Sequence, residues 1–341
     1  MTLAPTRPEG EAPAAAPRSR TPITVAALVA AVVGVSAVSV LVGARTLPVA
    51  AALDPDHPLR AIVDARIERT LLGLAVGAAL GLAGACMQGL TRNPLADPGI
   101  LGINAGAAFA MVVAISVLGI SDVTGYVWFA FLGAAVAAVV VHLVASLGRE
   151  GATPVKLAIA GAAVTAAVTS WTSGVLLIDR STMETFRLWQ VGTVGGRDLD
   201  VLLLGLPFLA VGALLALSGA RVLNALALGD DLARSLGRRT VLDRVVIGVA
   251  IVLLAGTATA LAGPIAFVGL MAPHAVRAMV GGSYALVLPL SAVTGAVVVV
   301  LADTLGRIVL PPAEVQVGIM TAIVGVPVFL VLIRRGGTAS L

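Results

Sequence analysis

Long apolar segments constrain this chain more than any other feature of its sequence. Runs of about 20 residues with almost no charged side chain recur from Ile23 onward, and a helix of that length spans the hydrocarbon core of a bilayer. Hydrophobic residues make up 59% of the 341 residues and charged residues only 12%, about half the share usual in soluble domains. A soluble fold could not bury so much apolar surface, so we predict an all-α, polytopic membrane protein.

Hydropathy predicts about ten spanning helices that are joined by polar segments on alternating sides of the bilayer. The eighth span is short and contains Pro273, so we expect a tilted or partial helix covered by other helices. Residues 1–21 are rich in Pro, Ala and Arg, which predicts a disordered cytoplasmic tail. Residues 22–335 then form the transmembrane domain, and residues 336–341 form a cytoplasmic C-terminal tail. The predicted spans are Ile23–Ala44, Thr70–Leu90, Pro98–Leu118, Val123–Leu147, Leu157–Leu177, Val201–Ser218, Val245–Ala262, Ile265–Val280, Leu286–Ile308 and Val315–Ile333.

The distribution of positive charge predicts the orientation of the chain. An even number of spans puts both termini on one side, and with cytoplasmic termini most of the 22 Lys and Arg residues lie in cytoplasmic segments. We therefore expect a multi-pass protein of the cytoplasmic membrane with both termini inside. Several arginines remain on the outer side of the membrane, among them Arg66, Arg69 and Arg307. The positive-inside pattern does not account for them, which indicates that they have another role. No basic run exists, so nucleic acid is not expected as a partner.

The sequence holds no motif for catalysis or for metal binding. Its three histidines lie far apart, and Cys86 is the one cysteine, so we expect no catalytic residue, no metal site and no cofactor on this chain. Asp303 is the best candidate for a carboxylate inside the membrane, and Arg307 four residues later is expected to neutralise it on the helix surface. One such site gives thin support for an ion-coupled secondary transporter. We predict that the chain forms a transport pathway without its own energy source, and that it is not an enzyme.

Two further patterns concern packing and partners. Glycines recur at helical spacing in the second span, at Gly73, Gly77, Gly81 and Gly84, which predicts close approach of helix backbones. The longest polar stretch between spans, residues 219–243, is predicted to form short amphipathic helices on the cytoplasmic face. Such helices could dock a soluble partner or lie at the lipid headgroups. The pattern alone favours neither of these two roles.

Specific motifs lie at both ends of the chain, and they resemble one family. From Ile23 to Arg335 the sequence resembles the permeases of ABC importers for iron-siderophores, haem and vitamin B12, and its motifs are most similar to those of ferric-siderophore (enterobactin-like) permeases. The motifs are Arg92-Asn93-Pro94-Leu95-Ala96-Asp97-Pro98-Gly99, Trp189-Gln190-Val191-Gly192, Gly263-Pro264-Ile265-Ala266-Phe267-Val268-Gly269-Leu270 and Pro273-His274 with Arg277.

The resemblance implies the fold of a type II ABC importer permease, with ten spans in each subunit. It implies a second permease subunit, two cytoplasmic ATPase subunits that bind ATP and Mg, and an extracytoplasmic substrate-binding protein. Ferric-siderophore permeases of this kind often form heterodimers, so a related sister subunit is favoured over a homodimer. A ferric siderophore is the implied substrate, and haem and cobalamin stay open as alternatives.

The resemblance also assigns a docking role to the outer arginines. Family arginines at the positions of Arg66, Arg69 and Arg307 meet glutamates of the binding protein, and a guanidinium offers the planar fork that a carboxylate accepts. Glu68 stands where the family often has Pro. An acid at this place could pair with one of the two arginines and weaken its contact with the binding protein.

Two more sites are implied on the cytoplasmic side. The inner gate corresponds to Asn93, Pro94 and Leu95, where the prolines predict a rigid turn, and the alternative is a connecting turn without gating. Thr169 and Ser170 of the fifth span are predicted to line the pathway. The loop that couples the permease to the ATPase corresponds to Gly229, Asp230, Arg234, Leu236 and Gly237. Gly229 is expected to end the first short helix and Gly237 to cap the second. Asp230, Arg234 and Leu236 are the candidates for the surface of this loop.

Overall fold

The computed structural model describes residues 21–120, 122–147, 152–235, 237 and 239–336, without the side chains of residues 332–336. The predicted tail before Thr21, the residues after Gly336, and Leu236 lie outside this part of the chain. The described part contains helices and no strand, as predicted. The helices are α1 (Thr21–Leu41), α2 (Val49–Leu53), α3 (Arg60–Thr91), η2 (Pro98–Leu101), α4 (Ile103–Leu118), α5 (Val123–Ala145), α6 (Pro154–Ile178), α7 (Arg180–Gln190), α8 (Leu199–Ser218), α9 (Ala220–Ala227), α10 (Asp230–Ser235), α11 (Thr240–Ile251), η3 (Val252–Gly256), α12 (Thr257–Ala262), α13 (Val268–Val280), α14 (Tyr284–Val309) and α15 (Val317–Gly336).

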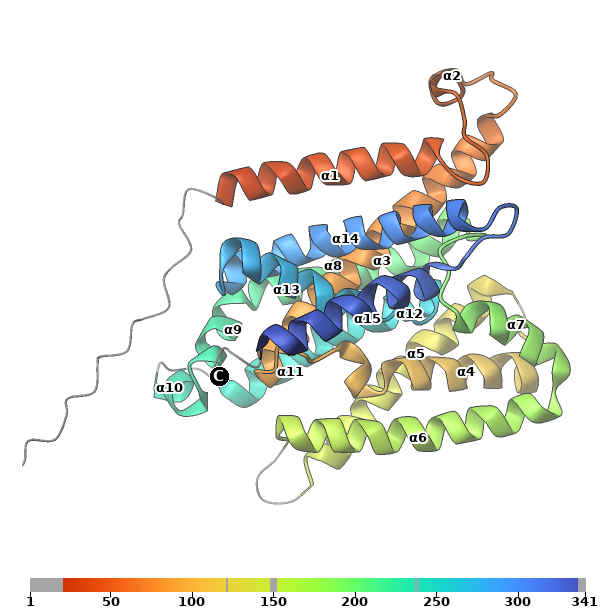
Figure 1. Cartoon of the computed structure of the whole chain (residues 1–341). Helices are drawn as coiled ribbons and strands as arrows, with labels where there is room; N and C mark the ends of the chain where they lie inside the picture. Colours follow the sequence, from red (N-terminus) through yellow and green to blue (C-terminus); the bar gives the residue numbers. More distant parts are fainter. Residues whose placement is uncertain (1–20, 121, 148–151, 236, 238, 337–341) are drawn as a thin grey trace, which may run out of the picture.

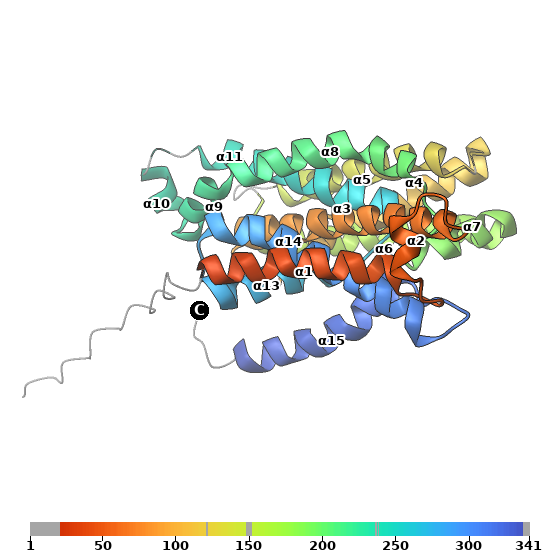
Figure 2. The same ribbon diagram turned by 90° about the horizontal axis from the view of Figure 1, so that it is seen from above.

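The long helices run side by side along one axis, with short helices at both ends of the bundle (Figure 1). One end carries α2 and α7, and we call it the outer end. The opposite end carries α9 and α10, and we call it the inner end. The start of α1 and the end of α15 both lie toward the inner end, and the view from above agrees (Figure 2). This arrangement is what an even number of crossings requires.

Each of the ten predicted spans is helical in the structure. Seven helices are long and apolar enough to cross a bilayer, and three shorter apolar helices, α4, α13 and the described part of α15, complete the ten. Arg60–Thr91 begins earlier than predicted, because it continues beyond the apolar run toward the outer end. Thr240–Ala262 is one rod that contains a π-helical turn at Val252–Gly256. The short α13 packs against α3 and α14, which confirms a partial helix covered by protein.

Helix α3 lies at the centre of the bundle because its glycines let neighbouring backbones approach. A methyl group on Gly77 would lie 2.4 Å from the carbonyl oxygen of Gly295, and one on Gly81 would lie 2.1 Å from that of Ser291. Further along α3, a methyl group on Gly84 would lie 1.9 Å from the carbonyl oxygen of Gly269. Only a residue without Cβ fits such contacts. The glycines of α3 therefore define a tight seam with α14 and α13, as their spacing predicts.

Candidate functional site

A cluster of charged residues lies at the outer end, where α3 meets α14 and the segment before α15. Arg69 of α3 donates from Nε and Nη2 to the carboxylate of Asp303 at 2.8–3.1 Å, and from Nη1 to Glu314 Oε2 at 2.7 Å. Its side chain and that of Asp303 are largely buried, whereas the Glu314 side chain is 37% exposed. Charge-assisted bonds of this kind are strong when they are shielded from water. Arg69 is thus held between one buried and one exposed carboxylate.

Arg307 is buried one helical turn beyond Asp303 and ties α14 to α1. Its Nη1 donates to the Ser39 carbonyl oxygen at 2.9 Å, and its Nη2 donates to Ser39 Oγ at 2.7 Å and to Thr304 Oγ1 at 3.1 Å. Its Nε lies 3.3 Å from Asp303 Oδ2. The predicted pair of Asp303 and Arg307 exists, but the prediction of a helix-surface pair is wrong. Both side chains are buried, and Asp303 makes its shortest ion pair with Arg69.

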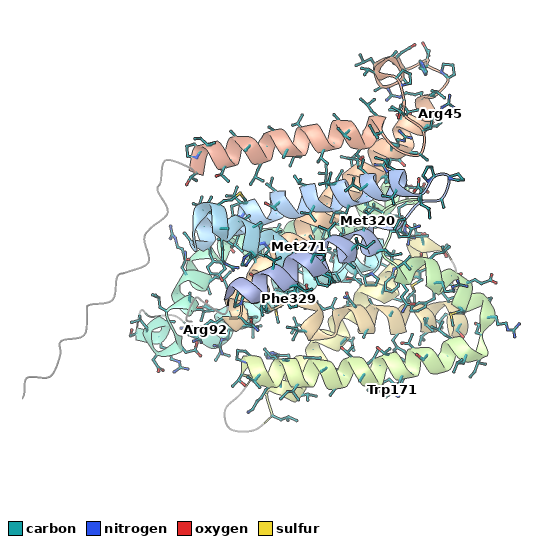
Figure 3. All side chains as sticks on the ribbon, viewed as in Figure 1. Arg45, Arg92, Trp171, Met271, Met320 and Phe329 are labelled. Carbon is teal, nitrogen blue, oxygen red and sulfur yellow. The ribbon has the colours of Figure 1, made fainter. Side chains whose placement is uncertain are left out.

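Arg66 differs from the other two arginines because no carboxylate of the described residues lies within ion-pair distance. Its Nη1 donates to the Val40 carbonyl oxygen at 3.1 Å, and its Nη2 donates to the Arg45 carbonyl oxygen at 2.6 Å. These bonds hold the guanidinium against the segment that follows α1. None of the described carboxylates therefore pairs with Arg66 directly, and Arg66 is half-buried at the outer end. Figure 3 shows the neighbouring Arg45 at the same end.

Glu68, which lies between Arg66 and Arg69 in the sequence, is not the acid that pairs with Arg69. The ion pairs of the described residues do not include Glu68, and Glu314 supplies the exposed carboxylate for Arg69 instead. Glu314 is 245 residues from Arg69 along the chain, so no local pattern pairs them. Ser39 was also missed, since a serine in an apolar first span carries no signal of its own. Gly195 completes the enclosure, because a methyl group there would lie 2.9 Å from Arg69 Nη1.

The loop that carries Gly195 is fixed to the bundle by backbone bonds. It follows α7, whose first turn is capped by Asp179 through bonds to Ser181 and Thr182. Those hydroxyl and amide donors hold the pKa of the Asp179 carboxyl well below its usual range. Beyond α7, the Thr193 amide donates to the Ala262 carbonyl oxygen at 2.7 Å. Helices and loops thus surround the arginines at the outer end.

At the inner end, the predicted turn follows α3. Helix α3 ends at Thr91, and Arg92 adopts a left-handed conformation with φ of 51°. Asn93 Oδ1 accepts from the Leu95 amide at 2.9 Å, and Asp97 Oδ1 accepts from the Gly99 amide at 2.8 Å. Pro94 and Leu95 are exposed. The sequence prediction of a turn at this place is confirmed, and side-chain caps close the turn at both of its ends.

Residues 219–243 form two short helices, as predicted. Helix α9 buries Leu223 and Leu226 against α3 and α14, and Asn224 Oδ1 accepts from the Tyr284 amide at 3.0 Å. Gly229 has φ of 105° and separates α9 from α10, and Gly237 follows α10 with φ of 78°. Positive φ is the reason that glycine stands at both breaks. The predicted helix break at Gly229 and the predicted helix cap at Gly237 are therefore confirmed.

Asp230, predicted as a surface residue of the coupling loop, is directed toward the bundle instead. Its carboxylate accepts two bonds of 2.8 Å from Arg244 Nη2, and it also pairs with Arg92. We call Arg92, Asp230 and Arg244 the inner triad. Arg234 is exposed as predicted, and among the described residues its ion pair is with Asp231, whose side chain is fully exposed. Asp230 lies three residues before Ala233, the buried residue of α10, so it shares the helix face that packs on the bundle.

Thr169 and Ser170 lie on the exposed side of α6, where the described residues leave the apolar face uncovered. Ser170 Oγ donates to the Ala166 carbonyl oxygen at 2.8 Å, so its hydroxyl is satisfied within the helix. Trp171 on the same helix is 62% exposed, and its ring centroid lies 6.0 Å from that of Phe109 in α4. This face is open to lipid or to a second subunit. In the described residues, no three His, Cys, Asp or Glu side chains gather into a metal site.

Comparisons with known proteins agree with the arrangement of helices and loops. The model of the FecCD transport family matches residues 23–335. The chain is 46% identical over 275 residues to the "Probable siderophore transport system permease protein YfiZ" of Bacillus subtilis, which covers 81% of this chain and 83% of the relative. It is 41% identical over 320 residues to the ferric enterobactin transport system permease protein FepD of Escherichia coli, which covers 92% of this chain and 95% of the relative.

The fold is also similar to a solved structure. An inward-facing protein that is assigned to the metal-chelate type of ABC transporter superposes with a TM-score of 0.81 at 27% identity. The superposition covers 92% of this chain and 99% of that chain. The similarity therefore extends from the outer cluster to the inner triad and involves the whole bundle.

Proposed function

Because this chain belongs to the FecCD transport family and is a permease subunit of an ABC importer for ferric chelates, we propose that its substrate is a ferric siderophore. The observation that carries this proposal is the match over residues 23–335 together with relatives that are named for siderophore and enterobactin transport. A third relative, 43% identical, is named for Fe(3+)-citrate import. Iron bound by an organic chelator is what these names share.

The assembly around the permease follows from its class. An ABC importer permease works with an ATPase and with a substrate-binding protein, and the permease itself carries no ATPase activity. We infer two ATPase subunits that bind ATP and Mg, and a second, related permease subunit that covers the exposed apolar faces of this bundle. The importer lies in the cytoplasmic membrane, with both termini of this chain on the cytoplasmic side. The chain itself takes no cofactor.

The outer cluster is the proposed docking site for the binding protein. Arg66 supports this role most directly, because its guanidinium is held by two carbonyl oxygens and forms no ion pair with a carboxylate of the described residues. A carboxylate on the binding protein would complete its charge balance through bidentate bonds. Arg69 is largely buried, and its pair with the exposed carboxylate of Glu314 places it at the edge of the site. Buried Arg307 contributes by positioning α1 and α14 beneath the site.

The inner end is the proposed coupling and gating region. Segment Gly229–Gly237, with exposed Arg234 on α10, lies where a cytoplasmic ATPase would dock, and it stands beside the turn at Asn93, Pro94 and Leu95. In the proposed cycle, ATP binding and hydrolysis by the partner moves the coupling segment. The turn then opens the pathway inward. Thr169 and Ser170 on the exposed side of α6 contribute to the pathway wall where two permease subunits face each other.

The test is uptake of radiolabelled ferric siderophore, haem and cobalamin by cells that lack only this chain. We expect loss of ferric-siderophore uptake alone, restored by the wild-type chain. Arg66→Glu should restore about tenfold less uptake than wild type, because a like charge then faces the docking carboxylate. Arg180→Glu, an exposed charge reversal on α7, is the matched control and should restore uptake fully.

Other outcomes would revise the proposal in defined ways. Loss of haem or cobalamin uptake with normal siderophore uptake would overturn the substrate class and leave the importer permease in place. Equal defects of Arg66→Glu and Arg180→Glu would contradict a docking role specific to Arg66. Purification of a tagged chain from cells that also contain an untagged copy decides between a homodimer and a pair of related permeases.

A further inference from the structure

Helix α10 is attached to the bundle by few apolar contacts. Ala233 is its one buried residue, whereas Leu232 is 48% exposed and Asp231 is fully exposed. Burial of a single small side chain contributes little hydrophobic stabilisation. Helix α9, by contrast, buries two leucines and is anchored by packing. What fixes α10 to the rest of the molecule must therefore be sought in its polar contacts.

Asp230 supplies those contacts, and it joins three elements at one carboxylate. It is the first residue of α10, it accepts from Arg92 at the end of α3, and it accepts from Arg244 in α11. All three side chains are partly exposed, between 27% and 40%. Two guanidiniums share one carboxylate, so removing the carboxylate leaves two like charges side by side. The carboxylate joins the three elements, and because all three side chains are partly exposed the contact remains accessible to water.

Arg92 connects this contact to the turn at 93–98, which behaves as one unit. The Ala96 amide donates to the Asn93 carbonyl oxygen at 3.1 Å, in addition to the side-chain bonds at both ends of the turn. Proline at positions 94 and 98 restricts the backbone further. A displacement of Arg92 must therefore move the whole turn rather than be absorbed within it. Figure 3 shows Arg92 at the inner end of the bundle, beside the short helices.

We propose that Asp230 is a positioning residue that transmits movement of α10 to the turn at 93–98 through Arg92, and to α11 through Arg244. The inference rests on the proposed function, in which an ATPase moves the coupling segment. It divides that segment into two faces. Asp231, Leu232 and Arg234 face outward and meet the ATPase, while Asp230 faces inward and carries the movement to the gate. Asp230 is thus excluded from the docking surface.

The test uses the complete importer in proteoliposomes, with its ATPase, the binding protein and a ferric siderophore. Asp230→Asn keeps the size of the side chain and removes its charge. We expect it to lower siderophore transported per ATP hydrolysed by about fivefold or more, the lower range of measured couplings between sites. The variant should still co-purify with the ATPase. Asp200→Asn, the same change at an exposed acid in the first turn of α8, is the matched control and should leave transport per ATP at the wild-type value.

A double variant separates transmission from a general loss of structure. If Asp230 acts through Arg92, then Asp230→Asn combined with Arg92→Gln should lower transport per ATP no further than the stronger single variant. Multiplied defects would overturn the proposal, and so would loss of ATPase co-purification in Asp230→Asn but not in Asp200→Asn. Absence of ATP-dependent uptake by the wild-type importer would instead reject the proposed function.

Discussion

The outer cluster and the inner triad use the same chemistry, arginine paired with a shared aspartate, in opposite environments. Asp303 and Arg307 are buried between long helices that are joined along the glycine seam. Asp230 and its two arginines are partly exposed, and they join a helix of six residues to a turn and to α11. Buried pairs are costly to break, while exposed pairs are worth little. We therefore expect the outer end to be rigid and the inner end to be mobile.

The largest effect is expected from the buried carboxylate. Asp303→Asn leaves Arg69 and Arg307 without their shared counter-charge, so we expect a loss of stability of about 3–5 kcal/mol. Thermal unfolding of the purified protein in detergent measures it. Asp64→Asn is the control, because its ion pair with Arg60 is exposed and should change stability by about 1 kcal/mol or less. Equal shifts for both variants would refute the contrast between buried and exposed pairs.

The seam that supports the outer cluster is tested by a single methyl group. Gly81→Ala forces α3 away from Ser291 of α14, and we expect a loss of about 1–3 kcal/mol. Gly34→Ala in α1 meets open space and should be neutral or slightly stabilising. The same unfolding experiment compares them. A stable Gly81→Ala variant would show that the seam can yield, and the outer end would then be less rigid than its contacts indicate.

These contacts also mark the limit of what the sequence could predict. Apolar runs, glycine spacing and proline positions act locally, so they predicted the spans, the seam and the turn after α3. The short motifs predicted the family to which the chain belongs. The pairings of Arg69 with Glu314, of Arg307 with Ser39 and of Asp230 with Arg244 depend on how distant helices meet, and no local pattern encodes them. For that reason the sequence placed Asp230 on the surface and Asp303 in a helix-surface pair.

The inner triad should contribute far less to stability than the outer cluster. Asp230→Asn is expected to lower the free energy of unfolding by about 1 kcal/mol or less, because its partners are partly exposed and the pairs are screened by salt. The comparison is sharpest when Asp230→Asn and Asp303→Asn are unfolded side by side at low and high salt. A loss for Asp230→Asn as large as that for Asp303→Asn would contradict a reversible inner contact.

The smallest effect is expected at the exposed edge of the outer cluster. Glu314 occupies Arg69 Nη1, where a carboxylate of the binding protein would otherwise bind. Glu314→Gln should therefore raise the affinity for the binding protein by about threefold, in the range of exposed ion pairs. Titration of the binding protein against the reconstituted importer measures the change. Weaker binding would indicate that Glu314 orients Arg69 for docking instead of competing with the partner.

One paired measurement tests whether the outer end docks the binding protein while the inner end transmits the movement of the ATPase. In the reconstituted importer, affinity for the binding protein and transport per ATP are measured for Arg66→Glu and for Asp230→Asn. The account predicts that Arg66→Glu loses affinity, and that Asp230→Asn keeps affinity and loses transport per ATP. If both variants lose affinity, or if Asp230→Asn transports normally, the two ends do not have the separate roles that their contacts indicate.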